Sequence, residues 1–154
     1  MGAKYISLDD SLYAYLCRCR SDANDPLLAD LRAETAALGE ASICQISDEQ
    51  GSFLSILVAA LGVRSAIEVG TFTGYSSLCI ARALPVDGRL LCVDQSEEWT
   101  AIARKYWAKA GLQDRIELRL GSAIPILQKL ETGLSFDFAF IDAEKTQYDA
   151  CGPR

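Results

Sequence analysis

The stretch AIEVGTFTGYSS, residues 66–77, decides the fold of this chain. It begins with a short apolar run and continues into a loop bracketed by Gly70 and Gly74. Such a run predicts a buried strand that ends in a turn, and the residues after the second glycine predict a helix. A carboxylate, Glu68, nevertheless lies inside the apolar run. Because a buried carboxylate needs a partner, its position needs an explanation beyond the fold.

Strands and helices are predicted to alternate from this stretch onward. The predicted strands are 65–70, 88–94, 115–121 and 136–142, and the helices between them are 74–84, 96–111 and 122–133. Serial strand–helix units favour a doubly wound parallel sheet with right-handed crossovers, so the predicted fold class is α/β. We find no internal repeat or linker, which predicts one domain over 1–154. It divides into N-terminal helices, 1–62, and an α/β core, 63–150.

Three helices are predicted before the core, at 8–20, 24–40 and 47–62. Asp25 is a natural N-cap for the second helix, and Ser47 with Gln50 forms a capping-box pattern at the start of the third. Gly39 and Gly62 are expected to end these two helices. Residues 1–62 are therefore predicted to form a group of N-terminal helices.

The composition excludes several classes of function. Of 154 residues, 50% are hydrophobic and 23% are charged, and the formal net charge is −6. An acidic chain is a poor match for nucleic acid or an anionic membrane surface, so neither is an expected partner. The sequence has no run of 18 apolar residues, and its N-terminus lacks the apolar core of a secretory signal. We expect a cytoplasmic location.

Cysteine and histidine usage narrows the chemistry. The chain has six cysteines and no histidine. Cys79 and Cys92 lie in apolar segments and are expected to be small core residues, which fits a reducing compartment. Without histidine or a CxxC pair, a zinc site of common type is not expected. Any acid–base chemistry must come from Asp, Glu, Lys, Tyr or Cys side chains.

The glycine loop is expected to bind a ligand. In open α/β sheets, ligands bind beyond the carboxyl ends of the strands, and backbone N–H groups at a helix start favour negative charge. The loop reads G-T-F-T-G, so Phe72 stands where a dinucleotide fingerprint has its central glycine. Asp94 ends the second predicted strand, where a carboxylate can accept hydrogen bonds from both hydroxyls of a ribose. Its alternative interpretation is a turn residue at a strand end.

Four segments of the sequence carry a family resemblance: IEVGTFTGYSS, LLCVD, LGSAIPIL and FAFIDAEKTQYDA. Together they resemble the cation-dependent O-methyltransferases, which include the catechol and caffeoyl-coenzyme A enzymes. The resemblance extends over about residues 5–150. It implies a Rossmann-like methyltransferase fold, S-adenosylmethionine as methyl donor and a divalent cation, with Mg²⁺ expected. It also implies a hydroxylated aromatic acceptor, and homodimers for the full-length family.

The same resemblance implies which residues bind the donor. Glu68 would lie at the floor of the donor site near the cationic methionine end; its alternative interpretation is a carboxylate capped by nearby backbone N–H groups. Asp94 would bind the ribose. Ser76 would hydrogen-bond the donor carboxylate, and Tyr75 would pack beside it. For these last two, an N-cap serine and a core aromatic are the alternative interpretations. The other donor-site residues that the resemblance implies are Ile46, Gly70, Thr71, Ala123 and Glu144.

The resemblance also implies two residues in the chemistry, one at the end of the fourth predicted strand and one shortly after it. Asp142 would ligate the cation, which would bind the acceptor hydroxyls and lower their pKa. Lys145 would then take the phenolic proton. Tyr148 matches a tyrosine of the family pattern, with Gln147 in place of an asparagine. A solvated turn is the alternative interpretation of this segment.

The chain is also shorter than the family it resembles. Family members continue with further strands, acceptor-binding loops and an Asp-Asn pair of the cation site, so we expect a C-terminal truncation and a sheet open beside its fourth strand. A non-catalytic fragment that binds the donor or a full-length homologue therefore stays open as an alternative. An NAD-dependent oxidoreductase is a second alternative, although Phe72 and the lack of histidine are against it.

Overall fold

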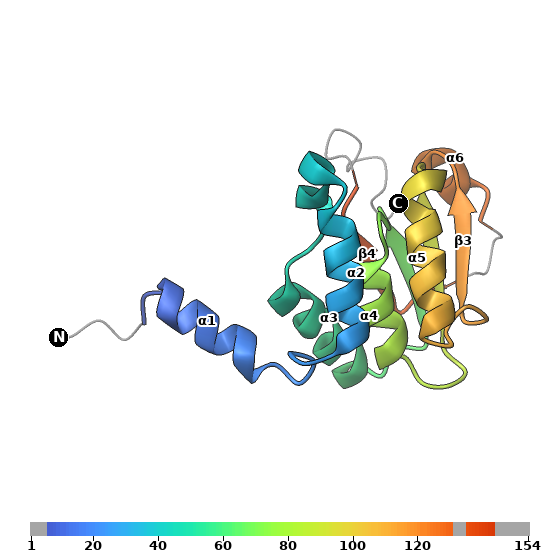
Figure 1. The fold of residues 1–154 in the computed structure, drawn as a ribbon. Coiled ribbons are helices and arrows are strands. Elements are labelled where there is room, and N and C mark those ends of the chain that lie inside the picture. Colours follow the sequence, from blue (N-terminus) through green and yellow to red (C-terminus); the bar gives the residue numbers. More distant parts are fainter. Residues whose placement is uncertain (1–5, 131–134, 144–154) are drawn as a thin grey trace.

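The described strands form one parallel sheet. The computed structural model describes residues 6–130 and 135–143. Its strands are β1 (Ser65–Val69), β2 (Arg89–Asp94), β3 (Ile116–Leu120) and β4 (Phe138–Ile141). Their order in the sheet is β3-β2-β1-β4, and every neighbouring pair is parallel (Figure 1). The predicted parallel α/β fold is confirmed, and β4 lies at one edge of the described sheet, as expected.

The strand register brings three carboxyl ends to one level. Val69, the last residue of β1, is opposite Val93 in β2 and Ile141 in β4. Gly70, Asp94 and Asp142 follow these positions directly. The residues that leave the three strands therefore meet at the same edge of the sheet, which is where the site is built.

Helices cover both faces of the sheet. The helices are α1 (Asp10–Cys19), α2 (Pro26–Ala36), the 3₁₀-helix η1 (Gly39–Cys44), α3 (Asp48–Ala60), α4 (Tyr75–Ala83), α5 (Glu97–Lys109) and α6 (Ala123–Gln128). Because side chains alternate along a strand, Ala66 and Cys92 pack with α2 to α5, whereas Ile67 and Val93 pack with α6. The sheet is thus doubly wound, as predicted.

Three predicted helix ends or caps differ from the structure. The helix predicted over 122–133 ends at Gln128, with Lys129 as its C-cap. The helix that starts after Asp25 ends at Ala36, and Gly39 (φ 66°) begins the short helix η1 instead of ending α2. Ser47 is the N-cap of α3, but within the described chain its side chain accepts no backbone N–H, so the predicted capping box is wrong. The acidic residues Asp48 and Glu49 complement the N-terminal dipole of α3 in its place.

Helix α1 differs from the others in its packing. It extends away from the body of the molecule (Figure 1), and within the described residues it buries none of its own side chains. Across residues 6–130 and 135–143, every helix is too short or too polar to cross a bilayer. The cysteines of this part of the chain are free thiols, and Cys79 and Cys92 are buried in the core as predicted.

Candidate functional site

A cavity of about 710 Å³ opens at the carboxyl ends of β1, β2 and β4. Its walls are the segment 43–47 before α3, the loop after β1, the first residues of α4, the segment 93–96 after β2, and residues at the start of α6 and the end of β4. A volume of this size is typical of a small-molecule site. The cavity therefore lies where the topology of the sheet predicts a ligand.

The glycine loop, residues 70–74, has a shape that its neighbours impose. Gly70 has a φ of 94°, and a Cβ there would lie 2.3 Å from the carbonyl oxygen of Asp142. Phe72 has a φ of 52°, which is uncommon outside glycine, and its ring contacts Trp99 edge to face with centroids 4.9 Å apart. Only glycine fits at position 70, because the end of β4 passes directly over it.

Asp94 holds this loop from the end of β2. Its Oδ2 accepts the backbone N–H groups of Thr71 and Phe72, each at 2.8 Å, and its Oδ1 accepts that of Ser96 at 2.8 Å. A carboxylate offers about four acceptor directions, so roughly one is left for a ligand. The predicted pairing with both hydroxyls of a ribose therefore requires the release of one of these backbone bonds.

Glu68 lies fully buried beside the cavity, with an exposed fraction of 0%. Its Oε2 accepts the Cys92 thiol at 3.5 Å, but its Oε1 has no hydrogen-bond partner among the described residues. Burial raises the pKa of Glu68 to about 7, although the nearby Ser76 and Thr71 hydroxyls act in the opposite direction. Both hydroxyl residues line the cavity, so a cationic ligand there would favour the ionised carboxylate.

The first turn of α4 also faces the cavity. Gly74 is its N-cap with a φ of 87°, and within the described chain no side chain caps this end. A Cβ on Gly74 would lie 2.6 Å from that of Ala103, so this glycine allows α4 to pack closely on α5. Tyr75 and Ser76 begin the helix and line the cavity. The uncapped N–H groups and the helix dipole suit a negative group of a ligand.

A buried hydroxyl network supports the loop from the N-terminal helices. The hydroxyls of Thr35 in α2 and Thr73 in the loop are 2.8 Å apart, and Gln45 Nε2 donates to both, at 3.0 and 3.2 Å. Gln45 and Thr73 also line the cavity. Sequence reasoning missed this network because its members lie far apart along the chain and match no short motif.

The structure brings most of the predicted site residues together. The cavity is lined by Ile46, Gly70, Thr71, Tyr75, Ser76, Asp94, Ala123 and Asp142. Glu68 lies behind this lining. Glu144 and Lys145, together with Gln147 and Tyr148, fall outside the described residues.

The described part of the chain does not complete a metal site. It contains no group of three His, Cys, Asp or Glu side chains that could hold a metal ion. Asp142 is the predicted ligand, and it lines the cavity. One carboxylate provides only part of the oxygen shell that Mg²⁺ needs.

Comparison with known proteins identifies the family. Residues 18–151 match a family whose description is O-methyltransferase. The chain belongs to the O-methyltransferase family. Among curated members of this family, caffeoyl-CoA O-methyltransferase 2 of Petunia hybrida is 37% identical over 152 residues, which cover 96% of this chain and 63% of the relative. Caffeoyl-CoA O-methyltransferase of Eucalyptus gunnii is 36% identical over 151 residues, with coverages of 96% and 61%. The chain thus spans less than two-thirds of these relatives.

Solved O-methyltransferase structures share the fold. An O-methyltransferase from Bacillus cereus, in complex with SAH, is 33% identical and has a TM-score of 0.82, covering 92% of this chain and 66% of that one. The O-methyltransferase TomG from Streptomyces achromogenes, in complex with SAM, is 29% identical with the same TM-score, and the coverages are 92% and 65%. The resemblance and the methyltransferase fold inferred from the sequence are confirmed.

Proposed function

We propose that this chain binds S-adenosylmethionine in the cavity and forms part of an O-methyltransferase that acts on a small aromatic acceptor. One observation carries the proposal. Glu68 is a buried carboxylate whose Oε1 has no hydrogen-bond partner among the described residues, and it lies behind a cavity whose rim holds Asp94 and the start of α4, which no described side chain caps. The relatives from Bacillus cereus and Streptomyces achromogenes are complexes with SAH and SAM, which supports the same ligand class here.

The donor's chemistry fits these residues group by group. Its methionine end carries positive charge, which Glu68 would stabilise from behind the lining. Its carboxylate would accept hydrogen bonds from the backbone N–H groups of Tyr75 and Ser76, where the helix dipole favours negative charge. Its ribose would use the remaining acceptor direction of Asp94. The planar adenine would pack in the part of the cavity lined by Trp99.

Methyl transfer would then depend mainly on positioning. The bound donor supplies an electrophilic methyl group, and the chain's residues hold it against an acceptor oxygen. We propose a catechol-like or caffeoyl-type hydroxyl as that acceptor and Lys145 as the base that removes its proton. Asp142 would contribute one ligand to a Mg²⁺ site, and the other ligands of that site would lie outside the described residues.

The remaining proposals concern the setting of the protein. We propose a cytoplasmic homodimer that binds neither nucleic acid nor membranes. The net charge of −6 supports the last two points. The free thiols of the described cysteines fit a reducing compartment.

Titration calorimetry with SAH, SAM and NAD tests donor binding. We expect SAH and SAM to bind with one site per chain, NAD to give no signal, and Asp94→Ala to weaken SAH by at least about 10-fold because three charge-assisted hydrogen bonds around the site are lost. Asp114→Ala is the control, since this carboxylate lies outside the cavity lining. NAD binding without SAH binding would favour the oxidoreductase alternative.

A turnover assay separates catalysis from binding alone. SAH formation is followed with catechol and with caffeoyl-CoA, each with and without MgCl₂. Mg²⁺-dependent turnover supports the full proposal. A chain that binds SAH but gives no turnover with either acceptor supports the non-catalytic alternative.

A further inference from the structure

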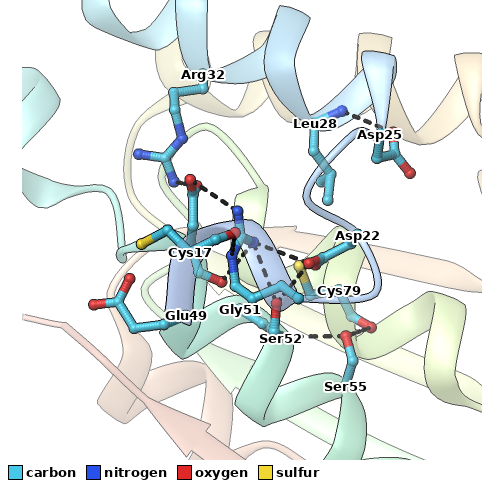
Figure 2. Close-up of polar contacts among 12 residues, drawn as sticks. Cys17, Asp22, Asp25, Leu28, Arg32, Glu49, Gly51, Ser52, Ser55 and Cys79 are labelled. Carbon is cyan, nitrogen blue, oxygen red and sulfur yellow. Dashed lines mark hydrogen bonds and ion pairs between the residues drawn. The ribbon is translucent and has the colours of Figure 1, made fainter. Parts of the chain in front are cut away.

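A partly buried ion-pair cluster joins the end of α1 to the start of α3. Arg20, the C-cap of α1, has a side chain only 11% exposed. Its Nη1 donates to Asp22 at 2.9 Å and to Ser52 at 3.2 Å, and its Nη2 donates to Asp48 at 3.1 Å. Ser52 in turn donates to Asp22 at 2.6 Å. Figure 2 shows two members of this cluster, Asp22 and Ser52, with their side chains turned toward one another.

Asp48 is the branch point of the cluster. It is the first residue of α3 and directly follows Ser47, which lines the cavity. Its Oδ1 accepts the hydroxyl of Tyr75 at 3.0 Å and also pairs with Arg32. The Arg32 guanidinium carbon lies 4.9 Å from the centroid of the Tyr75 ring. One carboxylate thus holds two arginines and the hydroxyl of a residue in the cavity wall.

Tyr75 has little freedom in this arrangement. A Cβ on Gly51 of α3 would lie 2.7 Å from the tyrosine Cε1, so the ring already packs directly against the helix backbone. Burial raises the pKa of its hydroxyl, which therefore stays protonated and donates to Asp48. The position of the ring is set by α3 on its face and by Asp48 at its hydroxyl.

We propose that Arg20 is a positioning residue for the cavity: it fixes Asp48, and through Asp48 it fixes the ring of Tyr75 in the cavity wall. Arg20 itself is outside the cavity lining. The inference rests on the proposed donor binding and adds to it a connection to α1. Charge-assisted hydrogen bonds from a planar guanidinium suit this task, because they define direction as well as distance.

A double-mutant cycle on SAH affinity tests the connection. Calorimetry compares the wild type, Arg20→Met, Tyr75→Phe and the double variant. We expect Arg20→Met to weaken SAH by about 10-fold in the wild-type background and by less than about 2-fold when Tyr75 is already phenylalanine, since the hydroxyl that transmits the effect is then absent. Arg64→Met removes an exposed arginine–aspartate pair with Asp87 and should leave SAH affinity unchanged.

The outcomes separate this inference from the proposed function. If the wild type binds SAH but Arg20→Met binds it equally well, or loses the same factor in both backgrounds, the inference is wrong and donor binding stands. If the wild type binds no SAH, both are wrong. Should Arg20→Met fail to fold by circular dichroism, Arg20→Lys replaces it. Lysine keeps the charge but loses the fork, so a loss that depends on the Tyr75 hydroxyl is still expected.

Discussion

The surroundings of Glu68 in the structure explain how a carboxylate can lie within an apolar strand. Glu68 points to the same face of β1 as Ala66, where α4 and Cys92 surround it. The Cys92 thiol donates one weak hydrogen bond, and burial raises the pKa of that thiol too, so it stays a neutral donor. Burial therefore favours the neutral form of the Glu68 carboxyl up to a pKa of about 7, and positive charge nearby would favour the ionised form.

The first prediction concerns the pH dependence of stability at Glu68. Its carboxyl binds a proton up to a pKa of about 7 when folded, against an ordinary value of 4.5. The folded state thus binds more protons between these values, and stability is lost as pH rises through them. We expect the free energy of unfolding of Glu68→Gln, relative to wild type, to rise by about 2–3 kcal/mol between pH 5 and pH 8.

Urea denaturation of both proteins at the two pH values measures this difference. Other carboxylates titrate equally in the two proteins and cancel in the comparison. Parallel stability profiles would contradict the prediction and would mean that Glu68 stays ionised in its buried position.

At the scale of elements, the glycine loop depends on contacts with three other parts of the chain. Asp94 at the end of β2 holds its backbone, the end of β4 covers Gly70, and Thr35 of α2 bonds Thr73. A segment fixed from several directions keeps its shape without a ligand. The loop is therefore a preformed part of the site.

The second prediction compares two glycines with positive φ. A Cβ on Gly70 (φ 94°) would meet the backbone of Asp142, whereas a Cβ on Gly111 (φ 70°) would have no neighbour within 4 Å. Gly111→Ala should lower the free energy of unfolding by about 1–2 kcal/mol through backbone strain alone. Gly70→Ala should lower it by about 3–5 kcal/mol, because it adds a clash to the strain. Equal losses by urea denaturation would show that β4 does not press on the loop.

The sequence predicts elements better than the contacts between them. The strand and helix periods, with Asp25 and Gly62 as end signals, place nearly every element correctly, because these signals are local. They miss the short helix that begins at Gly39, because a glycine is a signal for the end of a helix and not for the start of one. They also miss the Asp94 bonds to the loop and the Arg20 cluster, because these join residues that only the folded chain brings together.

At the scale of the whole molecule, apolar side chains remain on the surface of α3. Phe53 and Ile56 lie three residues apart on the outer face of this helix and are 60% and 64% exposed. Leu61, just beyond the helix, is also exposed. Nothing within the described residues covers them. Such a patch is a common feature of protein interfaces.

The third prediction is that this patch supports the proposed homodimer. Light scattering after size exclusion should give a mass that rises toward twice 16.7 kDa with concentration. Phe53→Glu should shift this equilibrium by at least about 10-fold toward the monomer, because it places a charge in an apolar interface. Val86→Glu is the matched control, since this valine is 87% exposed on the loop between α4 and β2. A dimer unaffected by Phe53→Glu would assign the interface to another surface.

The strand order has a consequence for synthesis on the ribosome. Of the described strands, β1 emerges first, β2 and β3 then add on one side of it, and β4 adds on the other side after them. Each new strand thus finds its neighbour already made, and the nascent chain can fold outward from its middle without waiting for its end. Stalled chains that end just after β3 should therefore already resist protease across β1 and β2.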